Sequence, residues 1–208
     1  MTRNEGVEHQ LQLAASRLAA KGLLQSGDMM SMRVPDENAT VSVHTDGSFS
    51  RSEIEASGTT HARIYAARSD IGAVLQFDLI WTRAMHEMRA TMPSVFDEQM
   101  IRLGRSVPCL GISSDDDLLI PAIAGQNNAF VCNDTTFCFG TGLERLLLNA
   151  ELLEKCAKAF VLARASGQPV HEIPIAEQDM AAGRLKNEED AAAARHRQGL
   201  YSILTKGY

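Results

Sequence analysis

The sequence predicts an α/β domain in which a sheet of about seven short strands is covered by helices on both sides. Apolar residues at helical spacing alternate along the chain with short β-rich runs, and no internal repeat is present. The 208 residues suffice for one domain with a large core that needs no disulfide. With 20 Lys and Arg against 26 Asp and Glu, the net charge is −6, as in an ordinary soluble globular protein.

Helices are expected where apolar residues recur every three or four positions. In chain order these are residues 7–21, 59–68, 79–88, 95–103, 117–124, 141–166 and 176–198. Gly22 and Gly167 stand where C-cap glycines end helices, and Thr141 with Glu144 has the spacing of a capping box. The last helix is rich in Ala and charged residues. We therefore expect residues 169–208 to form an arm that packs on the body, residues 1–168, or on a neighbouring subunit.

Strands are expected where short apolar or β-branched runs lie between turn residues. In chain order these are residues 29–33, 39–44, 71–75, 107–112, 129–132 and 137–139. Residues 35–38 and the Asp46-Gly47 pair have turn composition, which predicts a small hairpin or meander after the first helix.

Composition argues against several classes of partner and chemistry. No basic run or stripe is present, which argues against nucleic-acid and anionic-membrane partners. No stretch approaches the roughly 18 apolar residues of a membrane span, and the polar first ten residues lack a signal-peptide core, so we expect a cytoplasmic protein. The four cysteines lack the spacing of a disulfide or zinc-finger framework. The glycine motifs of dinucleotide, phosphate-loop and hydrolase sites are also absent.

The segment HARIYAARSDIGAVL, residues 61–75, resembles the helix-into-strand segment of the class II aldolase and adducin family. Residues 93–99 (PSVFDEQ), 133–140 and 142–154 match further segments in the family's order, so the resemblance covers most of residues 7–165. It implies a three-layer α/β/α domain with a central, mostly antiparallel sheet, usually assembled as a homotetramer. It also implies enzymes that cleave or epimerise small sugar phosphates with a divalent metal, commonly zinc.

At the positions of the family's three metal-binding histidines, this chain has other residues. The His-x-His that follows the strand is Gln76-Phe77-Asp78 here, and the histidine of Asn-His-Gly is Asp134. An amide and two carboxylates suit Mg²⁺, Mn²⁺ or Ca²⁺ better than Zn²⁺. We therefore expect any metal at Gln76, Asp78 and Asp134 to be one of these ions or residual zinc, bound weakly.

Positions that the resemblance assigns to the substrate are changed as well. The family's acid that acts as the base lies four residues before His61, where this chain has Ser57, followed by Gly58. The Gly-Asn of the phosphate-binding turn corresponds here to Asp28 and the residue after it, shortly before Ser31. An acidic Asp28 would repel a phosphate. We expect Asp28, Ser31, Ser57 and Gly58 to line a substrate site.

Three residues are candidates for acid–base chemistry. Asp78 and Asp134 could share a proton, which would raise the pKa of one of them. The simpler interpretation is that these residues changed by drift in a site that no longer has a function. Tyr201 lies in the tail, where some family members bring a tyrosine over the site as a proton donor. Among the histidines, we expect His61 to be structural and His196 to be solvated.

Two functions follow from these observations. In the first, the protein lacks the zinc centre and serves as a carbohydrate-binding or oligomeric scaffold, as the adducin branch of the family does. In the second, it is an active lyase or epimerase on a small sugar, sugar phosphate or hydroxy acid, with an oxygen-ligated metal. A third interpretation, a shifted register at Gln76 with ligands elsewhere, is disfavoured by the match on both sides. We favour the first and expect self-association, as a tetramer, and a small sugar-like ligand.

Overall fold

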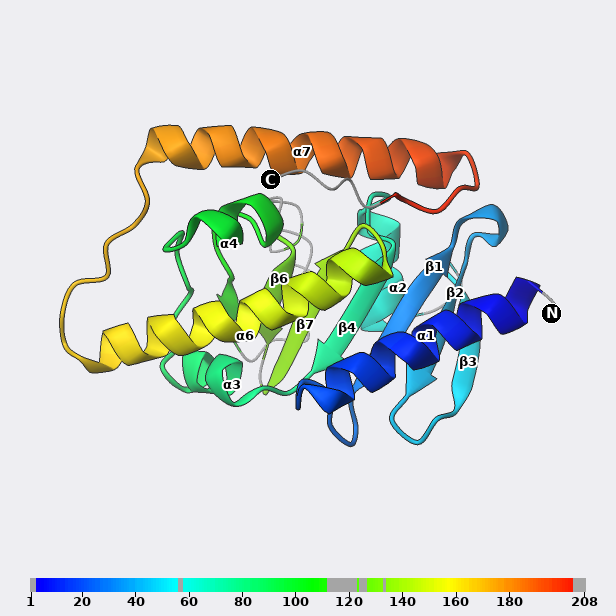
Figure 1. Cartoon of the computed structure of the whole chain (residues 1–208), viewed down its shortest axis with the longest axis horizontal. Coiled ribbons are helices and arrows are strands. Elements are labelled where there is room, and N and C mark those ends of the chain that lie inside the picture. The colour runs from blue at the N-terminus through cyan, green and yellow to red at the C-terminus, as the bar shows by residue number, and fades with distance from the viewer. Residues whose placement is uncertain (1–2, 56–57, 112–122, 124–126, 133, 204–208) are drawn as a thin grey trace.

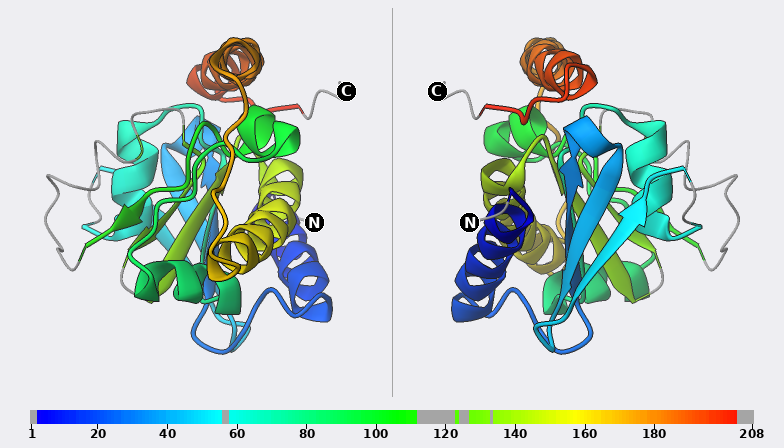
Figure 2. Two further views of the ribbon diagram at one scale, coloured as in Figure 1. Left: turned by 90° about the vertical axis from the view of Figure 1, so that its left-hand side faces the viewer. Right: turned by 90° about the vertical axis from the view of Figure 1, so that its right-hand side faces the viewer.

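The computed structural model describes residues 3–55, 58–111, 123, 127–132 and 134–203. Within these ranges, seven strands form one sheet in the order β3-β2-β1-β4-β7-β6-β5. Helices lie on both faces of the sheet, as the side views show (Figures 1 and 2). Neighbouring strands are antiparallel except for the parallel pair β5 and β6. The predicted three-layer α/β/α architecture with a mostly antiparallel sheet is confirmed.

The strands are β1 (Met29–Val34), β2 (Ala39–His44), β3 (Phe49–Glu53), β4 (Ala73–Phe77), β5 (Cys109–Leu110), β6 (Ala129–Cys132) and β7 (Thr135–Gly140). The helices are α1 (Arg3–Ala20), the 3-10 turn η1 (Pro35–Glu37), α2 (Thr60–Ala67), α3 (Ile80–Glu87), α4 (Asp97–Arg102), α6 (Leu143–Ala165) and α7 (Ile175–Arg197). Among the helical residues that the structure describes, no segment has the length and apolarity needed to cross a membrane.

Alternation along the strands builds a separate apolar cluster on each face of the sheet. On one face, Met30 and Leu75 belong to a large cluster with α1 and α6. On the other face, Val74 and Phe139 pack with Tyr65 of α2. Odd and even residues of β4 therefore point to different surroundings, which fixes the face on which each polar residue of the strand lies.

Strand β3 differs from the prediction. It pairs with β2 over five residues, yet four of its five residues are exposed and no apolar alternation marks it in the sequence. Its strand geometry comes from edge pairing. The strand expected at 107–112 is reduced to the two residues of β5 plus a single bridge between Met92 and Val107. Of the helix expected at 117–124, the structure describes residue 123 alone, which is helical; the other positions lie outside the described residues.

The predicted capping box at the start of α6 is wrong. The N-cap residue is Gly142, and no side chain caps the helix. The Thr141 hydroxyl donates instead to Glu188 of α7 at 3.4 Å, and Glu144 forms an ion pair with Arg17 of α1 at 2.8 Å. Contacts with distant helices therefore override the local pattern.

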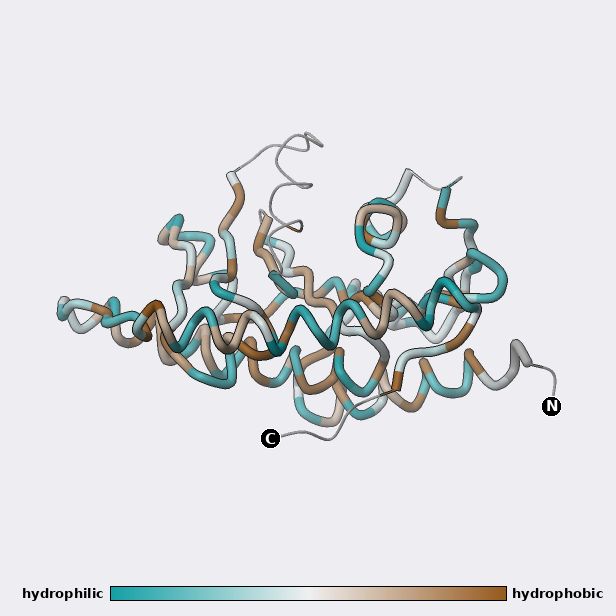
Figure 3. Tube along the Cα trace, turned by 90° about the horizontal axis from the view of Figure 1, so that it is seen from above, coloured by the Kyte–Doolittle hydropathy of each residue, from teal (hydrophilic) through white to brown (hydrophobic). Residues whose placement is uncertain are grey.

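Helix α7 runs along the top of the molecule, above one end of the sheet (Figure 1). Seen from above, its trace alternates between hydrophilic and weakly apolar residues (Figure 3). Glu189 accepts from Arg68 at 2.8 Å, and Glu188 accepts from Arg145 at 2.6 Å. Within one chain the last helix thus lies on the body, while a domain boundary at residue 168 stays a prediction.

Candidate functional site

The three positions that match the family's metal ligands lie at one end of the β4–β7 pair. Gln76 is half-buried in β4, opposite Phe137 of β7. Asp78 follows β4 directly, and the exposed Asp134 stands in the turn before β7. Because β4 and β7 are antiparallel, the end of β4 and the start of β7 meet at the same edge. The backbone therefore brings Gln76, Asp78 and Asp134 to one end of the sheet.

Asp78 has both carboxylate oxygens occupied. Arg83 of α3 donates from Nε to Oδ1 at 3.0 Å and from Nη2 to Oδ2. The two side chains are 35% and 54% exposed, so the pair lies at the surface. The spacing of five residues matches neither of the usual helix-surface pairs, which is why the sequence did not reveal Arg83 as a partner.

Asp28 has a structural task at the same end of the sheet. Its Oδ2 accepts from the backbone N–H of Gln25 at 2.6 Å, and its Oδ1 accepts from the backbone N–H of Asp78 at 3.2 Å. The carboxyl group is buried, and burial raises its pKa. Asp28 thereby ties the start of β1 to the end of β4, and both of its oxygens already have donors.

Ser31 joins two buried side chains of α2. Its Oγ lies 2.7 Å from His61 Nδ1 and 2.9 Å from Tyr65 Oη. Burial lowers the pKa of His61 to about 3 and raises that of Tyr65, so the ring is neutral and the phenol keeps its proton. Ser31 therefore links two uncharged buried side chains by hydrogen bonds.

The other ring nitrogen of His61 is buried as well. Nε2 has no hydrogen-bond partner among the described residues. The ring makes an edge contact with Phe137, with the centroids 6.2 Å apart. His61 is therefore a buried neutral group within the fold, in keeping with its expected structural role.

Further polar residues lie along this end of the sheet, in the strands between β4 and the sheet edge. Met29 of β1 lies between Gln76 and His44, each of which is its partner in the neighbouring strand. His44 is half-buried, and its Nε2 lies 3.3 Å from Ser50 Oγ. Gln76, His44 and Ser50 therefore offer amide, imidazole and hydroxyl groups on one face.

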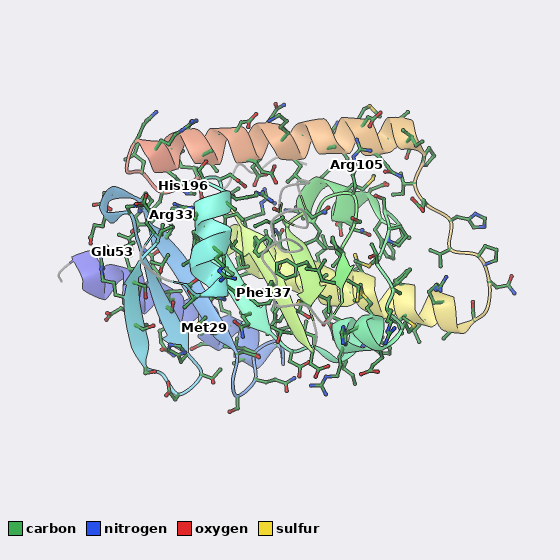
Figure 4. The ribbon with its side chains drawn as sticks, turned by 180° about the vertical axis from the view of Figure 1, so that it is seen from behind. Met29, Arg33, Glu53, Arg105, Phe137 and His196 are labelled. Atoms are coloured by element: carbon green, nitrogen blue, oxygen red, sulfur yellow. The ribbon has the colours of Figure 1, made fainter. Side chains whose placement is uncertain are left out.

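The remaining predicted residues are not gathered here. Ser57 lies outside the described residues, and Gly58 is exposed in the loop before Thr59, the N-cap of α2. Tyr201 lies at the opposite end of β4, where it lines a cavity together with Gly72. Seen from behind, Arg33 and His196 mark that end, whereas Met29 and Phe137 lie toward the candidate site (Figure 4).

The donor set does not fit the divalent metal that the fold implies. Both oxygens of Asp78 are bound to Arg83, and no three His, Cys, Asp or Glu side chains in the described ranges form a group that could hold an ion. Mg²⁺ and Ca²⁺ require more oxygen ligands than Gln76 and Asp134 supply. What the residues offer is hydrogen bonding, because amide, carboxylate and guanidinium groups together match the donors and acceptors of hydroxyl groups.

Comparison with known proteins agrees with this architecture. The family model described as the class II aldolase and adducin N-terminal domain matches residues 9–161. An L-fuculose 1-phosphate aldolase superimposes with a TM-score of 0.74 at 18% identity, covering 87% of this chain and 96% of its own. The L-fuculose 1-phosphate aldolase from Glaciozyma antarctica PI12 gives 0.66 at 16% identity, with 92% and 87% covered. An aldolase II superfamily protein from Pseudomonas syringae gives 0.67 at 18% identity, with 95% and 91% covered.

At these identities the structural matches show the fold alone. A search of curated proteins gives no match. The family model covers well over half of the 208 residues, and the resemblance predicted from residues 61–75 and the later segments is confirmed. The chain belongs to the class II aldolase and adducin family.

Proposed function

We propose that this class II aldolase-family protein binds a small sugar-like ligand without zinc and does not cleave it. One observation carries the proposal. Asp78, at the position of a family metal ligand, has both oxygens occupied by the Arg83 guanidinium. A cation at this position would have to displace an arginine that already neutralises the carboxylate.

The residues around Asp78 support a hydroxyl-rich ligand. Gln76 and His44 are half-buried on the same face, and Asp134 is exposed in the turn before β7. Asp28 places a buried carboxylate where the family's phosphate-binding turn begins. An unphosphorylated sugar would avoid this negative charge, so we expect it to bind more tightly than a sugar phosphate.

We also propose that the chain self-associates as a homotetramer. Light scattering should then give a mass four times the 22.7 kDa of one chain. A monomer at micromolar concentration would contradict this part of the proposal and leave the part about the metal intact.

Metal analysis tests the main proposal. Purified wild-type protein is expected to contain far less than one divalent ion per chain, and to leave L-fuculose 1-phosphate, the substrate named for two structural relatives, uncleaved after zinc is added. The triple variant Gln76→His/Asp78→His/Asp134→His should regain about one zinc per chain, because three imidazoles at these positions recreate a soft nitrogen site. Failure of a folded triple variant to bind zinc would show that the three side chains do not converge.

The alternative function predicts the opposite result. If wild-type protein carries stoichiometric Mg²⁺, Mn²⁺ or Ca²⁺, and both Asp78→Ala and Asp134→Ala lose it, an oxygen-ligated lyase or epimerase replaces our proposal. Asp97→Ala is the matched control, since Asp97 is an exposed carboxylate in α4. Loss of metal in the control as well would indicate unspecific surface binding, and the proposal would stand.

A further inference from the structure

A cavity of about 520 Å³ lies at the other end of the sheet from the candidate site. It is partly open and is lined by α1, the first turn of α6, the end of α7 and the segment that follows α7. Its volume is within the usual range of small-molecule sites, about 300–1,000 Å³. It also opens on the other face of the sheet, because Met32, which lines it, belongs to the cluster under α1 and α6.

Most of the cavity wall is apolar. Its apolar side chains are Leu13, Ala14, Met32 and Leu143, and the ring of Tyr201 adds to them. Leu13 is 53% exposed, which is unusual for a leucine on a helix that otherwise buries its apolar face. This surface suits a short hydrocarbon body.

The first turn of α6 supplies hydrogen-bond donors to the cavity. Residues 143–145 all line it, and the first bonded amide of the helix is that of Leu146, which donates to Gly142 at 2.9 Å. No side chain caps this helix, and the described residues provide no acceptor for the amides of residues 143–145. Three backbone N–H groups at the start of a 23-residue helix favour a negatively charged acceptor.

His196 of α7 supplies an acceptor. Its side chain is only 6% exposed and lines the same cavity. Nδ1 lies 2.8 Å from the carbonyl oxygen of Ser69, which can only accept, so Nδ1 carries the proton. Burial lowers the pKa of His196, so the ring is neutral at pH 7 and Nε2 presents a lone pair. Within the described part of the chain, no donor bonds to Nε2.

The charged side chains around the cavity are paired with one another. Arg17 binds Glu144 at the rim, and Arg145 binds Glu188 of α7. Gln10 and the hydroxyl-bearing Thr141, Tyr201 and Ser202 also line the cavity. The helix amides and His196 Nε2 are the polar groups on which we base the assignment of a ligand. The helix amides need an anionic acceptor, and His196 Nε2 needs a hydrogen-bond donor.

We propose that this cavity binds a small hydroxycarboxylate with a short apolar body. The carboxylate accepts from the amides of residues 143–145, the hydroxyl donates to His196 Nε2, and the hydrocarbon chain lies along Leu13 and Met32. This site is separate from the candidate site and does not depend on the function proposed there.

Calorimetric titration of the full chain tests the assignment, with 2-hydroxyhexanoate, hexanoate and the methyl ester of 2-hydroxyhexanoate as probes. We expect hexanoate to bind at least fivefold more weakly than 2-hydroxyhexanoate, because it cannot donate to His196. The ester, which has no negative charge for the helix amides, should bind at least tenfold more weakly. In His196→Phe the advantage of the hydroxyl group should disappear while hexanoate affinity stays unchanged.

Two further variants complete the test. Leu13→Ser, at an exposed position, should weaken both acids by a similar factor, and His171→Phe, at an exposed histidine away from the cavity, should change nothing. The proposal is overturned if no probe binds, if hexanoate or the ester binds as tightly as 2-hydroxyhexanoate, or if the hydroxyl advantage survives in His196→Phe. If His196→Phe does not fold, the comparison with the ester and the variant Leu13→Ser still test whether the cavity binds a hydroxycarboxylate.

Discussion

Strand β4 has an arginine–carboxylate pair at each end, and the two pairs differ in burial. Before the strand, Arg68 binds Asp70 through two hydrogen bonds of 3.0 and 2.5 Å and also binds Glu189 of α7. The side chains of Arg68 and Asp70 are 8% and 12% exposed. After the strand, Arg83 binds Asp78 in the same two-bond manner, but these side chains are 54% and 35% exposed.

This difference explains how the candidate site could change without loss of the fold. A buried ion pair cannot lose one partner without leaving a charge in a poorly solvated place, and burial raises the pKa of Glu189 to about 7 even beside Arg68. An exposed pair is solvated whether or not it forms. The α7 end of β4 is therefore constrained by stability, whereas Asp78 and the exposed Asp134 lie where substitution should cost little stability.

The largest expected effect comes from removing the buried guanidinium. Arg68→Met should lower the free energy of unfolding by about 3–5 kcal/mol, because Asp70 and Glu189 are left facing each other without a cation. The carbonyl oxygens of Ile123 and Asn127 also lose their donor. Urea denaturation followed by circular dichroism measures the change. A loss below about 1 kcal/mol would remove the contrast between the two ends.

The helices and strands with regular periodicity could be predicted from the sequence. Strands β1 and β2 and helix α6 lie within a residue or two of their expected bounds, because their apolar residues face one core. Strand β3 could not be predicted, since its exposed residues acquire strand geometry only by pairing with β2. The capping box at Thr141 failed because α6 has Gly142 as its N-cap, and the Thr141 hydroxyl instead donates to Glu188, 47 positions away.

The candidate site was only partly accessible to sequence reasoning. The family resemblance placed Gln76, Asp78 and Asp134 at matching positions, and the register of β4 and β7 brings them to one edge. The occupation of Asp78 by Arg83 depends on where α3 begins, which local spacing does not fix. His196 was expected to be solvated and is buried, because its role depends on α7 folding back over Ser69.

An effect of intermediate size is expected at His61, and it tests whether the candidate end of the sheet also contains a residue that the folded state needs for its stability. His61 is fully buried, and its pKa falls from 6.5 to about 3 on folding, so the unfolded chain takes up a proton below pH 6.5 and the folded chain does not. This contribution to stability is complete above pH 6.5 and declines as the pH falls toward 3. Between pH 6.5 and 5 the loss is about 2 kcal/mol.

The variant His61→Gln isolates that contribution. Its amide group can still form a hydrogen bond with Ser31, but it has no proton to gain, so the variant should lose about 2 kcal/mol less than the wild type between pH 6.5 and 5. His171→Gln, at an exposed histidine, should follow the wild-type curve. Parallel curves for wild type and His61→Gln would mean that folding does not lower the pKa of His61.

The smallest effect is expected at the exposed pair. Arg83→Met and Asp78→Asn should each change the free energy of unfolding by less than about 1 kcal/mol at low salt, because both side chains remain solvated when separated. A double-mutant cycle should give a coupling energy in the same range, and 1 M NaCl should reduce it further, since screening acts strongly on exposed charges. A coupling of several kcal/mol that resists salt would show that Asp78 and Arg83 are covered in solution, for example by a neighbouring subunit, and the candidate end would then be constrained by stability as strongly as the end held by Arg68.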